Sequence, residues 1–519
     1  MKFPSLCLLL LVTLFPFHVS AQGLDKQIND SFMPFAVWWE GLILGTIPIG
    51  GANIPVVLML LILGALFFTI YFKAVNVRLF PMAINVVRGK YDELERAANG
   101  GDQGEVNHFQ ALATAVSGTV GLGNISMVAV AISIGGPGAT FWMILAGILG
   151  MSTKFVECTL GVAYRDIDEN GKVFGGPMYY LSKGLKRKGF ATLGKVLAGI
   201  FAVLCVGASL GGGNAFQTNQ AAAQIISQFH IEHQASGSLI GLIFALFVGI
   251  VIIGGIKRIA KVTGKVVPFM ALLYVLAALF IIFSNISLVD DALALIVTEA
   301  FTPKATVTGG FIGVMIQGFR RAAFSNEAGA GSSAIAHSAV NTPYAASEGL
   351  VGLLEPFIDT VLICTMTAIV LILFNMDGMF VYGDVVNGKA LMLDGSRLGG
   401  INLTSQAFEH AIQGSSFVLV IAVILFAFST ILSWSYYGLQ AWKYLFGRGK
   451  WTDLIYKVIF LMFTVLGAAI TLDAVIKFSD AMILALVFPN MIGLLFLYPK
   501  AKKELEKYLN AIKMGLKKA

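Results

Sequence analysis

The chain contains few charged residues for its length. Asp, Glu, Lys and Arg make up 13% of the 519 residues, whereas hydrophobic residues make up 57%. Soluble domains carry about 25% charged residues, so this composition excludes an ordinary soluble enzyme or binding domain. It is typical of a polytopic membrane protein, in which charges are confined to the loops. The net charge of +7 is explained by basic residues that cluster beside apolar segments, not by a nucleic-acid partner.

Paired cysteines and nucleotide-binding signatures are also missing. The four cysteines form no CxxC pair, and three of them lie in apolar segments, so neither a disulfide framework nor a zinc site is expected. The string GLGNIS at 121–126 lacks the third glycine and the preceding strand of a dinucleotide-binding motif. No cofactor is therefore expected, and ATP is not expected to drive the protein.

What the sequence does contain is apolar windows long enough to cross a bilayer, which needs about 20 residues. They predict an all-α membrane protein of about eleven transmembrane helices in one domain over residues 54–500. The windows lie at 54–73, 109–134, 137–164, 196–227, 237–256, 263–284, 306–336, 347–374, 413–445, 453–476 and 479–498.

The chain begins with features of a signal peptide. Residues 1–21 combine Lys2, a leucine-rich core and a small-residue cleavage site ending at Ala21, as secretory signals do; an uncleaved first helix is the alternative. Residues 22–53 are apolar but broken by glycine and proline, with Trp38 and Trp39 suited to the headgroup level. We expect a periplasmic or interfacial segment there, and a twelfth span is the alternative.

Basic residues predict the orientation of the helices. Lysines and arginines concentrate in the loops at 73–96, 183–188 and 257–265 and in the tail at 501–519, whereas the loop at 375–412 carries several aspartates. Basic loops face the cytoplasm. The N-terminus and the loop at 375–412 should therefore lie outside the cell, and the C-terminus in the cytoplasm.

Two of the predicted spans are interrupted by glycines and polar residues. The span at 109–134 carries SGTVGLGNIS, and the span at 306–336 carries IQGFRRAAFSNEAGAGSS. They lie five spans apart and run in opposite directions, as the broken helices of a transporter built from inverted repeats do. Unwinding frees amides that attract an anion and carbonyls that attract a cation, and is tolerated only around a ligand-holding cavity. The alternative is that the glycines only allow close helix packing.

Long motifs around these breaks resemble the alanine or glycine:cation symporter family. They include HFQALATAVSGTVGLGNIS, VFGGPMYYL, GGGNAFQTNQAAAQ, GFRRAAFSNEAGAGSSAIAH and FAFSTILSWSYYG, in that order, within residues 55–500. The resemblance implies a five-plus-five inverted repeat similar to the neurotransmitter:sodium symporters. It also implies uptake of alanine and glycine across a bacterial inner membrane, driven by sodium, with protons as the alternative coupling ion.

The resemblance further implies site residues. The amides of Leu122 and Gly123 would face the substrate carboxylate, and Trp434 would wall a small pocket. Sodium would bind the carbonyls of Ser117 and Val120 and the hydroxyls of Ser429 and Thr430, since hard oxygen ligands suit this ion. The remaining substrate contacts implied are Thr119, Gly121, Asn124, Asn214, Gln217, Gly318, Phe319 and Thr430.

Charged residues inside the spans form a separate set. Lys154 with Glu157, and Asp473 with Lys477, have the spacing of helical ion pairs. Asp359 has no basic residue within a helical turn, so it is the acid that would carry a proton. A gate or anchor is expected on the cytoplasmic side of the second break, formed by Arg320, Arg321 and Glu327.

Two other function classes remain as alternatives to a transporter. An intramembrane enzyme could use Ser325 or Ser333 with His337, but no second base, acid pair or metal cluster supports it. A channel could be lined by broken helices, but a repeated filter and a ring of charges are missing. We therefore predict a transporter and not an enzyme.

Overall fold

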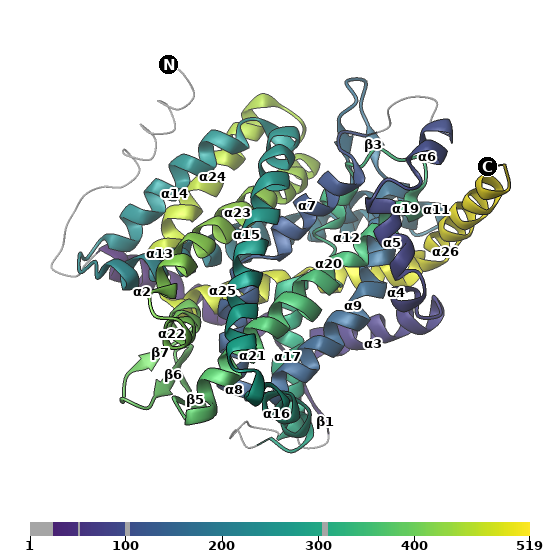
Figure 1. Ribbon diagram of the computed structural model, residues 1–519. Helices are drawn as coiled ribbons and strands as arrows, with labels where there is room; N and C mark the ends of the chain where they lie inside the picture. Colours follow the sequence, from purple (N-terminus) through teal and green to yellow (C-terminus); the bar gives the residue numbers. More distant parts are fainter. Residues whose placement is uncertain (1–23, 50–51, 99–103, 304–309, 519) are drawn as a thin grey trace.

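The computed structural model describes residues 24–49, 52–98, 104–303 and 310–518. The expected signal peptide at 1–21 lies outside the described residues. The fold is almost entirely helical, as predicted (Figure 1). The helices before the first break and through the first half are α2 (Leu24–Ile43), α3 (Val56–Tyr71), α4 (Val75–Arg78), α5 (Phe80–Val87), α6 (Asp92–Ala98), α7 (His108–Thr119), η1 (Leu122–Asn124), α8 (Ser126–Gly135), α9 (Gly138–Ala163), α10 (Pro177–Tyr179), η2 (Tyr180–Gly184), α11 (Leu185–Arg187), α12 (Ala191–Leu210), η3 (Gly211–Ala215), α13 (Phe216–Phe229), α14 (Ser236–Ile252) and α15 (Gly255–Ser284).

The second half of the chain is also mostly helical, with short strands between some of the helices. The three small sheets are antiparallel pairs or triplets at the ends of the helices. The helices are η4 (Ile286–Leu288), α16 (Val289–Phe301), α17 (Phe311–Asn326), α18 (Ala334–His337), α19 (Ala345–Gly352), α20 (Leu354–Pro356), η5 (Phe357–Cys364), α21 (Thr365–Phe374), η6 (Asn375–Asp377), α22 (Ile401–Ala411), α23 (Ser415–Phe446), α24 (Lys450–Ala469), α25 (Leu472–Ala485) and α26 (Val487–Lys518), and the strands are β1 (Thr46–Ile49), β2 (Ala52–Pro55), β3 (Asp166–Ile167), β4 (Val173–Phe174), β5 (Phe380–Val386), β6 (Lys389–Met392) and β7 (Arg397–Leu398).

Several of these helices are long and apolar enough to cross a membrane. In the described part of the chain there are 7, or up to 8 if the bent pair of α7 and α8 counts as one span; α3 and α14 are shorter apolar helices. The expected count of about eleven thus stays a prediction. Some of the expected windows cross helix ends: the window at 453–476 spans the end of α24 at Ala469, the window at 237–256 spans the end of α14 at Ile252, and the window at 479–498 spans the end of α25 at Ala485. The basic tail continues α26 to Lys518.

The elements outside the long helices gather on two opposite sides of the molecule (Figure 1). α2, α22 and the sheet of β5, β6 and β7 lie on one side, and α6, β3 and the end of α26 lie on the other. The α2 helix and the sheet of the loop at 375–412 lie on the same side; which side faces the cytoplasm stays a prediction from the charge pattern. We call the two sides the α22 side and the α6 side.

Residues 24–49 and 52–55 form a helix and two short strands. The α2 helix packs on α25, where Phe32 contacts the ring of Phe478 with centroids 5.1 Å apart. The strands β1 and β2 pair antiparallel, and β2 contacts α3 and α17. Asp25 accepts hydrogen bonds from Ser238 Oγ (2.6 Å) and Gly237 N (3.2 Å) at the start of α14. The segment is therefore a helix fixed to the transmembrane helices.

The α9 helix lies in the interior because glycines let other segments approach it closely. A Cβ atom added at Gly150 would lie 2.8 Å from Ala328 Cβ, and one at Gly161 would lie 2.9 Å from Ala334 O. Such distances leave no room for a side chain. Small residues at helix contacts are the usual way for transmembrane helices to pack tightly, and here they place α9 directly against the second broken helix.

Candidate functional site

The first broken helix has the form that its glycines predict. The α7 helix begins with a capping box, in which Asn107 Oδ1 accepts from Gln110 N at 2.8 Å, and it ends at Thr119. The turn η1 follows, and α8 continues at an angle of 54° to α7. The break at Val120–Ile125 is fully buried. The prediction of a break at this position is confirmed.

Side chains from other helices satisfy part of the backbone freed at this break. Gly121 N donates to Asn124 Oδ1 at 2.9 Å, and Leu122 N donates to Gln217 Oε1 at 3.0 Å. The other end of the Asn124 amide donates to Asp359 Oδ1 at 2.6 Å. Unpaired amides and carbonyls are costly in a membrane interior. Gln217 and Asn124 therefore hold the break open in its unwound shape.

The second broken helix unwinds after α17. Glu327 has a φ of 56°, and Gly329 and Gly331 have φ values of 94° and 81°, so the chain leaves the helix through left-handed backbone that favours glycine. Glu157 Oε1 accepts from Gly329 N (3.0 Å) and from Asn490 Nδ2 (2.7 Å). The chain becomes helical again only in the short α18. The second predicted break is confirmed, with its return half much shorter than the first.

Trp434 joins the two breaks. Its indole Nε1 lies 3.2 Å from Gly118 O at the end of α7 and 3.2 Å from Glu327 Oε1 at the second break. The ring is 1% exposed, and a Cβ at Gly213 would lie closer than 3.0 Å to it. Trp434 thus lies between both interrupted helices and η3.

The hydroxyls of α23 face the first break. Thr430 Oγ1 is buried and is among the described side-chain atoms that have no hydrogen-bond partner. A Cβ at Gly121 would lie closer than 3.0 Å to this oxygen. Ser117 Oγ donates to Ser429 O at 2.7 Å, which ties α7 to the same turn of α23. The structure therefore brings together Ser117, Gly121, Ser429 and Thr430.

The hydroxyls of Thr119 and Ser429 have partners nearby. Thr119 Oγ1 donates to Ala115 O at 3.3 Å, within its own helix. Ser429 Oγ donates to Phe426 O at 3.1 Å, also within its own helix. A hydroxyl oxygen that donates to its own helix keeps lone pairs for a cation. These bonds therefore leave both oxygens available as acceptors.

Three residues expected in the site lie away from the first break. Asn214 Nδ2 donates to Phe460 O of α24 at 2.7 Å. Gly318 lies inside the continuous helix α17, where a Cβ would meet Trp142 and Ala139 of α9. Phe319 faces the same Trp142 ring at 6.3 Å between centroids. Their positions fasten η3 to α24 and α17 to α9.

Tyr437 was missed by reasoning from the sequence. Its hydroxyl is buried without a hydrogen-bond partner among the described residues, and a Cβ at Gly118 would lie 2.9 Å from that oxygen. The ring also contacts Trp434, with centroids 5.3 Å apart. The signal was present, because a residue three positions after Trp434 shares its helix face.

The charged residues inside the spans differ from their expected pairing. Lys154 forms its ion pair with Glu355 at 3.1 Å and not with Glu157, because Glu157 is occupied at the second break. Asp473 and Lys477 do pair along one helix. Asp359 meets the first break through Asn124, as described above. The sequence spacing could not distinguish these outcomes, since the competing partners come from distant segments.

The arginines of α17 require a correction. Arg320 and Arg321 precede the break at Glu327, and Arg320 pairs with Glu40 of α2 at 2.5 Å and with Asp480 at 2.8 Å. Their cluster therefore lies on the α22 side of the second break and not on the opposite, cytoplasmic side that we expected. Arg321 also pairs with Asp480.

The loop between η6 and α23 covers the first break from the α22 side. Thr404 Oγ1 of α22 donates to Ile125 O at 3.1 Å, and Ile401 N donates to Gln220 Oε1 at 2.9 Å. Above this contact lies a cavity of about 760 Å³, whose lining includes Asn29 of α2 and Arg397 of β7. The α22 helix thus contacts the first break through Thr404, while Asn402 of the same helix lines the cavity.

Comparison with known proteins gives a family match over most of the chain. The sequence profile of the Sodium:alanine symporter family matches residues 48–519. The Sodium/alanine symporter AgcS of Methanococcus maripaludis is 37% identical over 444 residues, which are 85% of this chain and 92% of that protein. The Probable sodium/glutamine symporter GlnT of Bacillus subtilis is 32% identical, over 88% of each chain.

A solved structure, that of MhsT in complex with L-phenylalanine, is similar with a TM-score of 0.46 and 15% identity. The similarity covers 77% of this chain and 100% of that one.

Proposed function

Because the chain belongs to the sodium:alanine symporter family, we propose that it carries alanine across the membrane together with sodium by alternating access. It is a membrane transporter and not an enzyme. Glycine is a second substrate in this proposal, and a proton is the alternative coupling ion. A bacterial inner membrane, with the α22 side periplasmic and the α6 side cytoplasmic, agrees with the basic loops and with the arrangement of the elements. The five-plus-five inverted repeat is part of the same proposal.

The observation that carries the sodium site is the unpartnered hydroxyl of Thr430. A buried hydroxyl without a partner costs free energy unless it binds a ligand. Thr430 Oγ1 faces the unwound backbone at Gly121, where carbonyls of Ser117 and Val120 end the half-helix. A half-helix C-terminus attracts a cation. Sodium would be held there by these carbonyls, Thr430 and Ser429.

The substrate site is proposed between the first break and Trp434. The amides of Leu122 and Gly123 begin the turn that leads into α8, and such a start attracts a carboxylate. Leu122 N is held by Gln217 Oε1 in this structure, so binding of the carboxylate would displace Gln217, which then turns to the substrate. Trp434 would limit the size of the side chain. Thr119, Gly121, Asn124 and Thr430 complete this pocket in the proposal.

Asn214, Gly318 and Phe319 have a different role in the proposal. Their contacts hold η3 against α24 and α17 against α9. We assign them to the support of the site and not to substrate contact.

The test is uptake of labelled alanine into proteoliposomes under an imposed inward sodium gradient. Concentrative uptake that requires sodium and is lost in Thr430→Ala would support the transporter and its ion site. The matched control is Thr464→Ala, because Thr464 is equally buried but its hydroxyl donates to Phe460 O of its own helix at 3.1 Å. Labelled glycine and glutamine are run in parallel. Flux that never exceeds equilibrium would indicate a channel, and no uptake of any of the three would refute the proposed substrates.

A further inference from the structure

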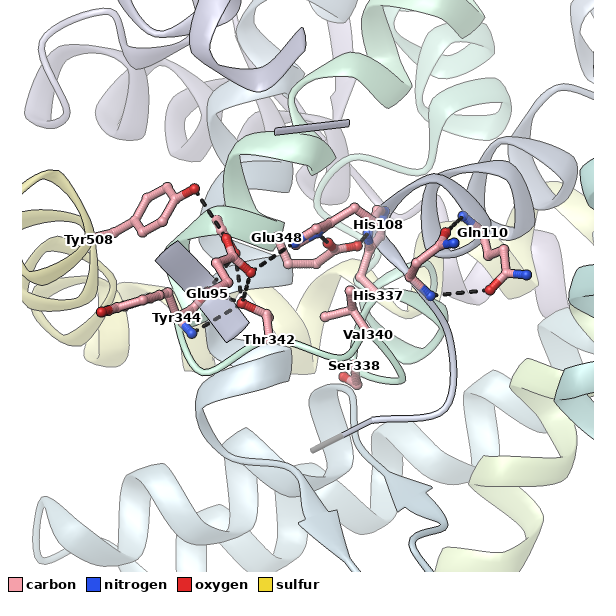
Figure 2. A network of polar contacts seen from close by, with 12 residues as sticks. Glu95, His108, Gln110, His337, Ser338, Val340, Thr342, Tyr344, Glu348 and Tyr508 are labelled. Carbon is pink, nitrogen blue, oxygen red and sulfur yellow. Dashed lines mark hydrogen bonds and ion pairs between the residues drawn. The ribbon is translucent and has the colours of Figure 1, made fainter. Parts of the chain in front are cut away.

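The α6 side carries a cavity that leads to a line of buried titratable groups. The cavity has a volume of about 770 Å³, and Glu95, Glu105, His108 and Lys257 contribute to its lining. Figure 2 shows the polar contacts that begin at its wall. The side chains of Glu95 and His108 are only 7% and 9% exposed. The line therefore starts at the edge of the cavity and continues into the protein.

The first part of this line alternates carboxylates and imidazoles. His108 Nε2 lies 3.1 Å from Glu95 Oε2, and His108 Nδ1 lies 2.5 Å from Glu348 Oε2. The other oxygen of Glu348 lies 2.5 Å from His337 Nδ1. Figure 2 shows Glu348 between the two histidine rings. Each step from Glu95 to His337 is thus a direct contact between a ring nitrogen and a carboxylate oxygen.

The second part reaches the loop that breaks the second helix. His337 Nε2 lies 3.5 Å from Glu355 Oε2, and Glu355 Oε1 lies 3.1 Å from Lys154 Nζ. Lys154 Nζ in turn donates to Ser333 Oγ at 2.5 Å, at the end of the break loop. The side chains of His337, Glu355 and Lys154 are 0% exposed. We call the five groups from Glu95 to Glu355 the relay: Glu95, His108, Glu348, His337 and Glu355.

Several polar and charged side chains of the described residues surround the relay. Glu95 also accepts from Thr342 Oγ1 (2.5 Å) and Tyr508 OH (3.2 Å). Cys158 lies within hydrogen-bonding reach of His337. Arg165 acts on Glu348 through its charge, and Glu157 and Glu327 act on Lys154 in the same way.

An extended line of this kind is difficult to explain as packing. Buried ion pairs are often no more stable than apolar side chains of the same volume, and ionisable groups inside a membrane domain are usually functional. Among the described residues, no group of three or more His, Cys, Asp or Glu converges as a metal site would require. The alternation instead suits proton transfer, since imidazole can accept a proton on one nitrogen and release one from the other.

We propose that the relay conducts a proton between the cavity on the α6 side and the loop of the second break. The inference deepens the proposed function, because it names a route for a coupled proton. Each imidazole binds a proton on the nitrogen that faces the cavity side of the relay. It then releases the proton from its other nitrogen to the next carboxylate along the relay. One proton therefore moves without any redox partner. At the inner end Glu355 accepts it, which breaks the ion pair with Lys154 and leaves Lys154 bound to Ser333 of the break loop.

The test measures the pH inside proteoliposomes, with a pH-sensitive dye, during sodium-driven uptake of alanine. Wild type should show a pH change that depends on alanine. His337→Gln keeps hydrogen-bonding groups beside Glu348 but cannot pass a proton through a ring, so the pH change should be lost. Sodium-dependent binding of alanine in detergent should stay within about threefold of wild type. The matched control is His230→Asn, which replaces an exposed histidine outside the relay with a residue that tolerates its φ of 49°.

Each outcome decides the question. A wild-type pH change that persists in His337→Gln overturns the relay, and so does intact alanine uptake with no pH change in wild type. If His337→Gln no longer binds alanine, Glu95→Gln at the cavity edge decides: at least a tenfold slower pH change supports the relay, and an unchanged rate overturns it. If wild type takes up no alanine, the proposed function fails separately. Proton entry under an imposed pH gradient then tests the relay, which equal rates in wild type and His337→Gln would overturn.

Discussion

Replacing Gly121 with alanine should damage the transport site through a single methyl group. The φ of Gly121 is −134°, which is open to any residue, so the backbone does not require glycine. The surrounding space does require glycine, because the new Cβ would lie closer than 3.0 Å to Thr430 Oγ1 and at 3.0 Å from Gln217 Oε1. Thr430 would have to turn away from the break, and Gln217 would have to release Leu122 N.

The size of the effect follows from the cost of overpacking. Inserting a methyl group into a filled site costs about 1–3 kcal/mol, and about 1.4 kcal/mol corresponds to a tenfold change in affinity. Because the displaced oxygen is the proposed sodium ligand, we expect sodium-dependent binding of alanine to weaken by roughly 5- to 150-fold. The affinity for sodium should fall together with the affinity for alanine.

The control is the same substitution two residues later. A Cβ at Gly123 would lie 3.5 Å from Phe324 Cδ1, an ordinary contact, so Gly123→Ala should bind both ligands within about threefold of wild type. Binding of labelled alanine is titrated with sodium for both variants, and their melting temperatures are recorded. The reasoning is refuted if Gly121→Ala binds like wild type, or if Gly123→Ala is damaged equally.

Three further substitutions test other contacts. Thr430→Ala should raise the sodium concentration for half-maximal uptake by about ten- to a hundredfold, because a polar contact to a charged group contributes about 1.5–3 kcal/mol. Thr430→Ser keeps the hydroxyl and should restore the wild-type concentration. Equal sodium curves for the two variants would contradict the site. Arg321→Met should destabilise the protein by less than the roughly 3 kcal/mol that loss of an isolated buried pair costs, because Asp480 keeps its ion pair with Arg320; adding Arg320→Met, which removes both arginines from Asp480, should lower the melting temperature further. Hydrogen bonds from Gly414 N and Ser416 N hold the pKa of Glu409 below its usual range. Its contribution to stability is therefore present above the unfolded pKa of about 4.3 and lost as pH falls through the lowered value, so Glu409→Gln should lower the melting temperature at pH 7 but not well below pH 4.

The sequence predicts the break at 120–125 correctly because the local signal is strong. Glycines beside Asn124 and Thr119 weaken the helix in the chain itself, and unwinding needs no knowledge of the neighbours. The same holds for the second break, where Gly329 and Gly331 take left-handed backbone. The membrane class follows from the composition, and the all-α fold follows from apolar windows long enough to cross a bilayer.

Partners that come from distant segments could not be predicted in this way. Lys154 and Glu157 have ideal spacing for a helical pair, but Glu355 lies closer in the folded chain and Glu157 is taken by Gly329 N. The relay is a stronger example, because His108 and Glu348 are 240 positions apart. Only the packing of α7 against α19 brings them into contact.

The anchoring of α2 has a consequence for the biosynthesis of the chain. Asp25 bonds to Ser238, Glu40 to Arg320, and Asn29 Oδ1 accepts from Thr471 N at 3.0 Å across 442 positions. Chains are synthesised at about 5–20 residues per second, so Thr471 is added roughly 20 to 90 seconds after Asn29. The α2 helix is therefore made early, but its contact with Thr471 forms only when the chain is nearly complete.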